Sequence, residues 1–208
     1  MTRPSPASPT VLTPEELGVG ARFSIHPMAD DFVDLILGAL ESVEPGGLTV
    51  ETDTVSTYLA GPEDDLVRYI VEATAAVARS GVHTVAQVLL SRGCPGEMTC
   101  ELSEGELPVP AELTPPLATG LRAEADWSLY PLSDGGEGID HMAEIEKAIT
   151  DARRRGVEVD PRHYATRLRG DLAEVVSAAC QAWMAAGASV PHVTTHLTLS
   201  LNSPTGGG

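Results

Sequence analysis

The stretch ARFSIHPM, residues 21–28, decides the fold, because a closely similar pattern returns as ADWSLYPL at residues 125–132. Both read small residue, polar or charged residue, aromatic, Ser, aliphatic, ring, Pro, aliphatic. The alternation of polar and apolar residues predicts a strand that turns Phe23 and Ile25 toward a core. The recurrence predicts that one unit is written twice.

Working outward from residues 21–28, the sequence predicts five further elements. DDFVDLILGALESV has apolar residues at helical spacing and stops at Pro45-Gly46-Gly47. The β-branched stretch 48–61 divides near Thr52-Asp53 into two strands. A helix over 62–81 and a strand over 83–93 follow. The order β-α-β-β-α-β is the ferredoxin-like unit.

The second half repeats this order. It predicts a strand at 124–132, a helix at 138–156, two strands around Asp160-Pro161 within 157–170, a helix at 171–187 and a strand at 190–202. Ser24 and Ser128 lie 104 residues apart, whereas Thr57 and Thr166 lie 109 apart, and the extra GGEGI accounts for the difference. We therefore predict an α+β protein of tandem ferredoxin-like repeats, each an antiparallel sheet with helices on one face.

Composition sets the boundaries of the two repeats. Pro, Ser and Thr dominate the N-terminus, and Pro and acidic residues dominate the stretch before the second copy. The predicted divisions are a disordered arm at 1–19, a first repeat at 20–100, a linker at 101–120, a second repeat at 121–203 and a flexible tail at 204–208.

The last strand of each unit, VAQVLLS or VTTHLTLSL, is interpreted as apolar at both alternating sets of positions, which predicts that both faces of the strand are buried. A sheet with helices on one face leaves its other face open, and an open face with apolar content must be covered. We expect the second repeat or a homodimer to provide that cover.

The charge excludes some partners. Thirteen basic and thirty acidic side chains give a formal charge of −17, which repels nucleic acid and anionic membranes. No segment has the length of a membrane span and the N-terminus lacks a signal-peptide core, so we expect no membrane insertion and a cytoplasmic location.

Catalytic and metal-binding patterns are missing from the sequence. It contains no GxSxG elbow, no phosphate loop and no HExxH, and His192 and His196 are too far apart on one strand to share a metal. Three cysteines are too few for a disulfide framework. Cys94 as a nucleophile stays an alternative without further support.

Several motifs together resemble the YkoF family of thiamin and hydroxymethylpyrimidine-binding proteins. They are GARFSIHPMADDFVDLILGALESV, TDTVSTYLAG, the loop SRGCPGE, and WSLYPLSD in the second copy. The resemblance spans residues 20–202. It implies tandem ACT-like repeats, a homodimer, and a thiamin-type ligand held without chemical turnover, with no cofactor.

Candidate ligand-binding residues cluster at the end of the first strand and around the third strand of each copy. A pyrimidine needs an apolar slot and a few convergent polar groups. The candidates are Ser24, His26, Asp30, Asp31, Thr54, Ser56 and Thr57 in the first copy, and Ser128, Tyr130, Asp134, Tyr164 and Thr166 in the second. Each has a structural interpretation too, such as helix capping for Asp30 and Asp31 and core packing for the neighbouring Trp127.

The sequence therefore favours a non-catalytic binding protein for thiamin or its pyrimidine, in salvage or delivery. The alternative is an ACT-like regulatory or assembly module whose sheet face binds a protein partner.

Overall fold

The structure is a computed structural model that describes residues 13–14, 16–93, 113–132, 141–188, 190 and 192–205. The first repeat comprises β1 (Gly20–Pro27), α1 (Phe32–Ser42), β2 (Thr49–Thr52), β3 (Thr57–Ala60), α2 (Glu63–Ala78) and β4 (Thr84–Arg92). The second comprises β5 (Arg122–Leu132), α3 (His141–Arg154), β6 (Glu158–Arg162), β7 (Ala165–Asp171), α4 (Leu172–Ala186) and β8 (His192–Leu201).

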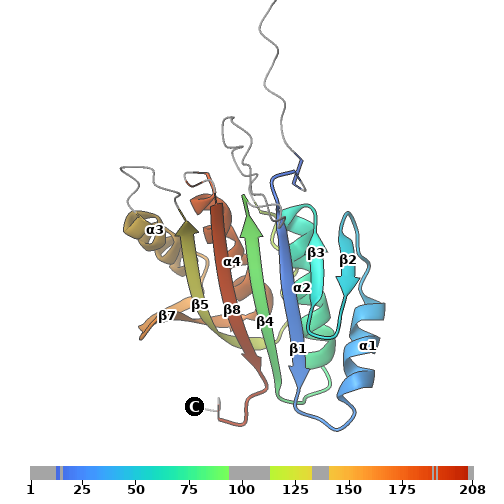
Figure 1. Cartoon of the computed structure of the whole chain (residues 1–208). Coiled ribbons are helices and arrows are strands. Elements are labelled where there is room, and N and C mark those ends of the chain that lie inside the picture. The colour runs from blue at the N-terminus through green and yellow to red at the C-terminus, as the bar shows by residue number, and fades with distance from the viewer. Residues whose placement is uncertain are drawn as a thin grey trace, which may run out of the picture.

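All the strands in the described residues join one eight-stranded antiparallel sheet in the order β2-β3-β1-β4-β8-β5-β7-β6. The four helices that the structure describes cover one face, with α2 and α4 behind the centre and α1 and α3 toward the two ends (Figure 1). The α+β class and the tandem ferredoxin-like, ACT-like repeats predicted from the sequence are confirmed.

The two repeats are related by a pseudo-twofold axis at the middle of the sheet. The strand order is the same read from either end once β2, β3, β1 and β4 are exchanged for β6, β7, β5 and β8. At the junction Val88 of β4 pairs with Leu197 of β8, and these residues are 109 apart, the same offset that relates Thr57 to Thr166. Each residue of this central pair therefore faces its own counterpart.

This junction corrects one expectation about the sheet face. Because β4 and β8 pair edge to edge, the open faces of both repeats point to the same side, and neither repeat covers the other. The backbone hydrogen bonds between β4 and β8 pair the strand edge that each repeat would otherwise expose.

Strand β8 also differs from its interpretation as apolar on both faces, which is wrong. Its inward residues are buried, and its outward residues are all polar: His192, Thr194, His196, Thr198 and Ser200. Strand β4 keeps some apolar content outward, since Leu89 is 41% exposed. Of the two last strands, only β4 therefore has an exposed apolar residue on the open face, although Tyr130 and Leu132 of β5 are also exposed on that side.

The core lies between the sheet and the helices. Phe23 and Ile25 are buried there, as is Trp127, whose predicted core position is confirmed. The indole Nε1 of Trp127 donates to Thr195 Oγ1 at 2.8 Å, and that of Trp183 donates to the Val193 carbonyl at 2.9 Å. Both buried polar groups thus have partners, as burial requires.

The hairpin between β6 and β7 turns later than predicted. The sequence placed the turn at Asp160-Pro161, but Pro161 lies within β6 and pairs with Thr166, and the turn falls at His163 and Tyr164. Proline is tolerated there because β6 is an edge strand and needs no hydrogen bond on its outer side. Tyr164 takes a positive φ of 65° and is fully exposed.

Two segments predicted as arm and linker pack against the repeats where the structure describes them. Val19 is buried and its carbonyl accepts from Gly61 N at 3.3 Å, so packing begins before Gly20. Leu113 is buried, and Thr114 N donates to Asp64 of α2 at 3.1 Å. Residues 113–120 therefore tie the second repeat to the first.

Candidate functional site

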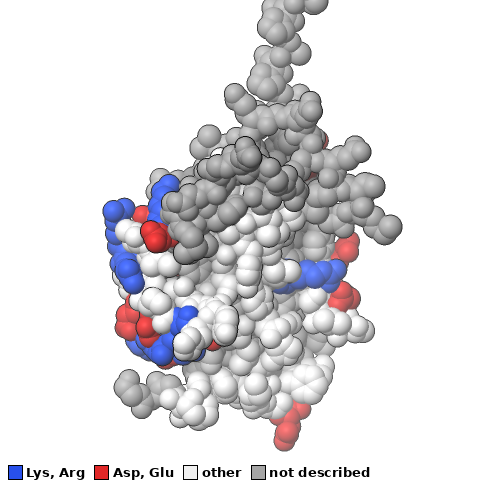
Figure 2. All heavy atoms as spheres, turned by 60° about the vertical axis from the view of Figure 1, so that its left-hand side comes forward, with Lys and Arg blue, Asp and Glu red and all other residues white. Residues whose placement is uncertain are grey.

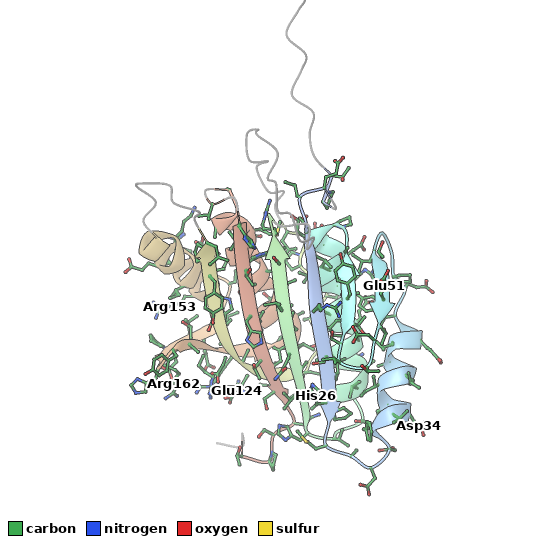
Figure 3. The ribbon with its side chains drawn as sticks, viewed as in Figure 1. His26, Asp34, Glu51, Glu124, Arg153 and Arg162 are labelled. Carbon is green, nitrogen blue, oxygen red and sulfur yellow. The ribbon has the colours of Figure 1, made fainter. Side chains whose placement is uncertain are left out.

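The open face of β1 carries the polar residues singled out from the sequence. Phe23 and Ile25 point into the core, so Arg22, Ser24 and His26 point to the open side of the sheet. Figure 3 shows His26 near the lower end of this strand. Two of the predicted residues, Ser24 and His26, therefore share a surface, and Ser24 Oγ lies 2.9 Å from His26 Nε2.

Arg22 connects this strand to the turn between β2 and β3. Its Nη1 donates to Asp53 Oδ2 at 2.7 Å and to Ser56 Oγ at 2.9 Å. Its guanidinium carbon lies 5.6 Å from the centroid of the Tyr58 ring, which the register places beside it. A cation, a carboxylate, a hydroxyl and an aromatic face thus meet in one exposed cluster.

Asp53 is held ionised by this arrangement. Its Oδ1 accepts from Ser56 N at 2.9 Å and from Val55 N at 2.8 Å, an Asx-type turn. These backbone hydrogen bonds, together with the one from Arg22, lower the pKa of Asp53 to about 2. At neutral pH it is a carboxylate that can accept a hydrogen bond from a ligand amino group.

The second repeat places the opposite charge at the equivalent position. Asp126 stands 104 residues after Arg22, and Arg167 stands 109 after Tyr58. Arg167 donates Nε to Asp126 Oδ1 at 2.7 Å and Nη2 to Asp126 Oδ2 at 3.2 Å, and its Nη1 reaches Glu124 Oε2 at 3.4 Å. The hydrogen bond with Asp126 raises the pKa of Arg167.

A groove of about 860 Å³ lies over this ion-pair cluster, bounded by β5–β8 and residues 202–205. Glu124, Asp126 and Arg167 line it, whereas Ser128 does not. Figure 2 shows basic and acidic side chains grouped side by side next to a broad uncharged surface. The groove is therefore polar and charge-balanced rather than an apolar slot.

Ser128 and Tyr130 lie further along β5 on the same open side. Tyr130 is 49% exposed, and Ser128 Oγ donates to the Tyr164 carbonyl at 3.3 Å. Ser128 therefore contacts the backbone of the β6–β7 turn, whereas the side chain of Tyr164 is fully exposed.

The remaining predicted residues do not join these groups. Thr57 pairs with Phe23 and Thr166 with Trp127, so both threonines face the helices rather than the open side. Asp30, Asp31 and Thr54 are exposed in loops. Asp31 takes the N-cap position of α1, but its side chain makes no capping hydrogen bond. Asp134 lies outside the described residues. Ligand contact by any of these residues stays a prediction.

Sequence reasoning missed Arg22, Asp53 and Tyr58 in the first repeat and Glu124, Asp126 and Arg167 in the second. The alternation of β1 could have found Arg22, because it shares a face with Ser24. Tyr58 and Arg167 join their clusters only through strand pairing, which no local pattern specifies.

Other chemistry has little support in the described part of the chain. Cys180 is buried, and burial raises the pKa of its thiol. Cys94 lies outside the described residues. Among those described, no three potential metal ligands gather, and no helix has the length and apolar character to cross a membrane.

Comparison with known proteins agrees with the duplicated architecture. The model of the YKOF-related family matches residues 18–97 and again residues 122–206. The chain is 34% identical over 193 residues to the putative HMP/thiamine-binding protein YkoF of Bacillus subtilis (strain 168), covering 89% of this chain and 90% of that protein.

Proposed function

Because this chain belongs to the YKOF-related family, we propose that it binds hydroxymethylpyrimidine or thiamin without converting it chemically, and that it serves thiamin salvage or delivery. The support is twofold. The Bacillus subtilis relative is named as a putative HMP/thiamine-binding protein. The open sheet face of the first repeat gathers groups that match an aminopyrimidine.

The cluster around Arg22 is the observation that carries this proposal. An aminopyrimidine has a flat ring, an exocyclic amino donor and ring-nitrogen acceptors. Asp53, ionised with a pKa of about 2, accepts from the amino group, and Ser24 or His26 donates to a ring nitrogen. Tyr58 offers an aromatic face, which Arg22 now covers at 5.6 Å. The ring would stack there once the Arg22 side chain moves aside, and the Asp53 carboxylate would then favour the thiazolium of thiamin.

The second repeat provides a related but different surface. Ser128 and Tyr130 take the places of Ser24 and His26, but Asp126, already bound to Arg167, replaces Arg22. We expect the second repeat to bind through Tyr130 stacking and Ser128, with Asp126 released from Arg167 only at a cost. The two repeats would therefore differ in affinity.

The proposal includes a homodimer. No helix covers the described open face of the sheet, and Leu89 of β4 is 41% exposed there, so a second copy packed on this face would bury apolar surface. Light scattering at several protein concentrations tests this part separately from ligand binding.

Thermal unfolding with and without millimolar thiamin, hydroxymethylpyrimidine or thiamin phosphate tests the binding function. A ligand at about 100 times its Kd stabilises by roughly 2.7 kcal/mol, which raises the melting temperature by roughly 5–10 °C in a chain of this size. Ser24→Ala and Asp53→Asn should reduce the shift if the first repeat binds, and Ser128→Ala if the second does. Ser42→Ala, at the end of α1, is the matched control and should leave the shift unchanged.

The competing function is a module that binds a protein partner through the open sheet face. It predicts a folded protein whose melting temperature no ligand changes. That result would overturn the binding proposal.

A further inference from the structure

Helix α1 exposes more apolar surface than its packing requires. Phe32, Val33 and Leu37 are 50%, 49% and 52% exposed, although Leu35 and Ala39 already face the interior. At about 100° per residue the apolar positions of α1 cover roughly 200° of its circumference, about twice the stripe that one packed face needs. We call the exposed set Phe32, Val33 and Leu37 the α1 face.

The equivalent helix α3 shows that the fold does not require this surface. The 109-residue offset aligns Leu40 with Ile149, and both are partly buried and pack against the core. The same offset aligns Leu37 with Glu146, which is exposed. At the position of Leu37, the apolar surface is thus a feature of the first repeat alone.

The surroundings of the α1 face are acidic. Between Arg22 and Arg68 the sequence has no Lys or Arg and ten Asp or Glu residues. Asp30, Asp31, Asp34 and Glu41 flank the face, and none of the four forms an ion pair with another described residue. Figure 3 shows Asp34 projecting outward from α1 at the edge of the molecule.

These charges decide between occupants. Two copies meeting through this face would bring two sets of four unpaired carboxylates together, and like charges at an interface oppose association. An anionic membrane surface is repelled for the same reason. A segment that carries apolar residues beside Lys or Arg meets both the apolar surface and its acidic rim.

We propose that the α1 face docks a basic amphipathic segment of a partner protein. Phe32, Val33 and Leu37 bury the apolar residues of that segment, and the flanking carboxylates pair with its Lys or Arg side chains. This surface lies on the helix layer, so it is separate from the open sheet face and does not depend on ligand binding.

Three synthetic helical peptides test the proposal by fluorescence anisotropy on the full chain. The first has leucines on one face and lysines on the other, the second replaces its leucines with serine, and the third replaces its lysines with glutamate. The leucine–lysine peptide should bind at least roughly ten-fold more tightly than either of the others, since one buried leucine is worth about that factor. Its affinity should fall as salt rises.

Leu37→Glu separates the apolar contribution from charge. It installs the residue that α3 carries at the equivalent position, so folding, checked by circular dichroism and melting temperature, should be retained. The added carboxylate attracts lysine, yet the affinity of the leucine–lysine peptide should fall roughly ten-fold because apolar contact is lost. Glu146→Ala on α3 is the matched control and should leave that affinity unchanged.

Three outcomes overturn the proposal. Equal binding of the serine–lysine peptide would mean that overall negative charge alone attracts cations. An unchanged affinity in Leu37→Glu would place the peptide elsewhere. A wild-type oligomer in light scattering that Leu37→Glu dissociates would mean that a second copy of this chain occupies the α1 face.

Discussion

Replacing Asp171 should destabilise the protein, because one carboxylate joins the linker to α4. Asp171 is the N-cap of α4, and its Oδ1 accepts from Ala173 N at 2.9 Å. It also accepts from Thr119 N at 3.0 Å and from Gly120 N at 2.7 Å. The cap is worth about 1 kcal/mol, and each linker N–H adds roughly 0.5–1 kcal/mol at this partly exposed position. Asp171→Ala should therefore lower the free energy of unfolding by roughly 2–3 kcal/mol.

The contribution of Asp171 should also depend on pH. Partial burial raises the pKa of Asp171, but the hydrogen bonds from Thr119, Ala173 and Gly120 lower it, and the result lies below the ordinary value. A carboxylate with a depressed pKa stabilises the folded state above its unfolded pKa of about 3.9, and this stability is lost as the pH falls through the folded pKa.

Urea unfolding of wild type, Asp171→Ala and Asp171→Asn between pH 3 and pH 7 measures both effects. Asp171→Asn keeps an acceptor for the cap but has no charge, so it should lose part of the stability and most of this residue's pH dependence. The first repeat offers an internal comparison, because Pro62 occupies the equivalent position, 109 residues earlier, and α2 has no side-chain cap. A loss below about 0.5 kcal/mol in Asp171→Ala would refute the assigned role of these hydrogen bonds.

Three further predictions concern other sites. Arg92 is buried, with its Nη1 3.8 Å from Glu63 Oε1 and its guanidinium carbon 5.8 Å from the centroid of the Trp183 ring. Glu63→Ala removes the carboxylate beside this cation and should lower the free energy of unfolding in urea by about 3 kcal/mol, whereas Arg92→Met, which removes the buried charge, should lower it by less than about 1 kcal/mol. A larger loss in Arg92→Met than in Glu63→Ala would contradict this reasoning. Tyr164→Gly should raise the melting temperature or leave it unchanged, because glycine adopts the positive φ of 65° without strain. If the Tyr164 ring contacts the ligand, the same variant should bind that ligand more weakly in calorimetric titrations. Because the pKa of Asp53 is about 2, the difference in binding free energy between wild type and Asp53→Asn should be constant from about pH 4 to pH 8 and shrink only as the pH falls toward 2. A midpoint of this difference near neutral pH in calorimetric titrations would assign the titrating group elsewhere.

Local patterns were enough to predict most elements of the fold. The alternation in β1 and the repeat offsets of 104 and 109 residues predicted the order of strands and helices in both units. They did not predict the β6–β7 turn at His163 and Tyr164, because a proline in an edge strand looks the same in sequence as a proline in a turn. They also did not predict the pairing of β4 with β8, because the join between two strand edges depends on residues about 109 apart.

The candidate site was predicted less completely for a related reason. Ser24 and His26 share a face through local alternation, which the sequence displays. Thr57 shares the repeat offset with Thr166, but both face the helices, because strand pairing decides the face and an offset does not. Arg22 and Asp53 are 31 residues apart in the sequence, and no local pattern predicts their contact.

The pairing of Val88 with Leu197 has a consequence for how this protein can evolve. In a dimer of single-repeat chains with the same sheet, one gene encodes both halves, so every substitution appears on both sides of the axis. Here each half is encoded separately. Leu37 can therefore stand on one helix and Glu146 at the equivalent position of the other, and likewise Arg22 on one strand and Asp126 on the other. Fusion thus allows the two halves of one sheet to acquire different surfaces.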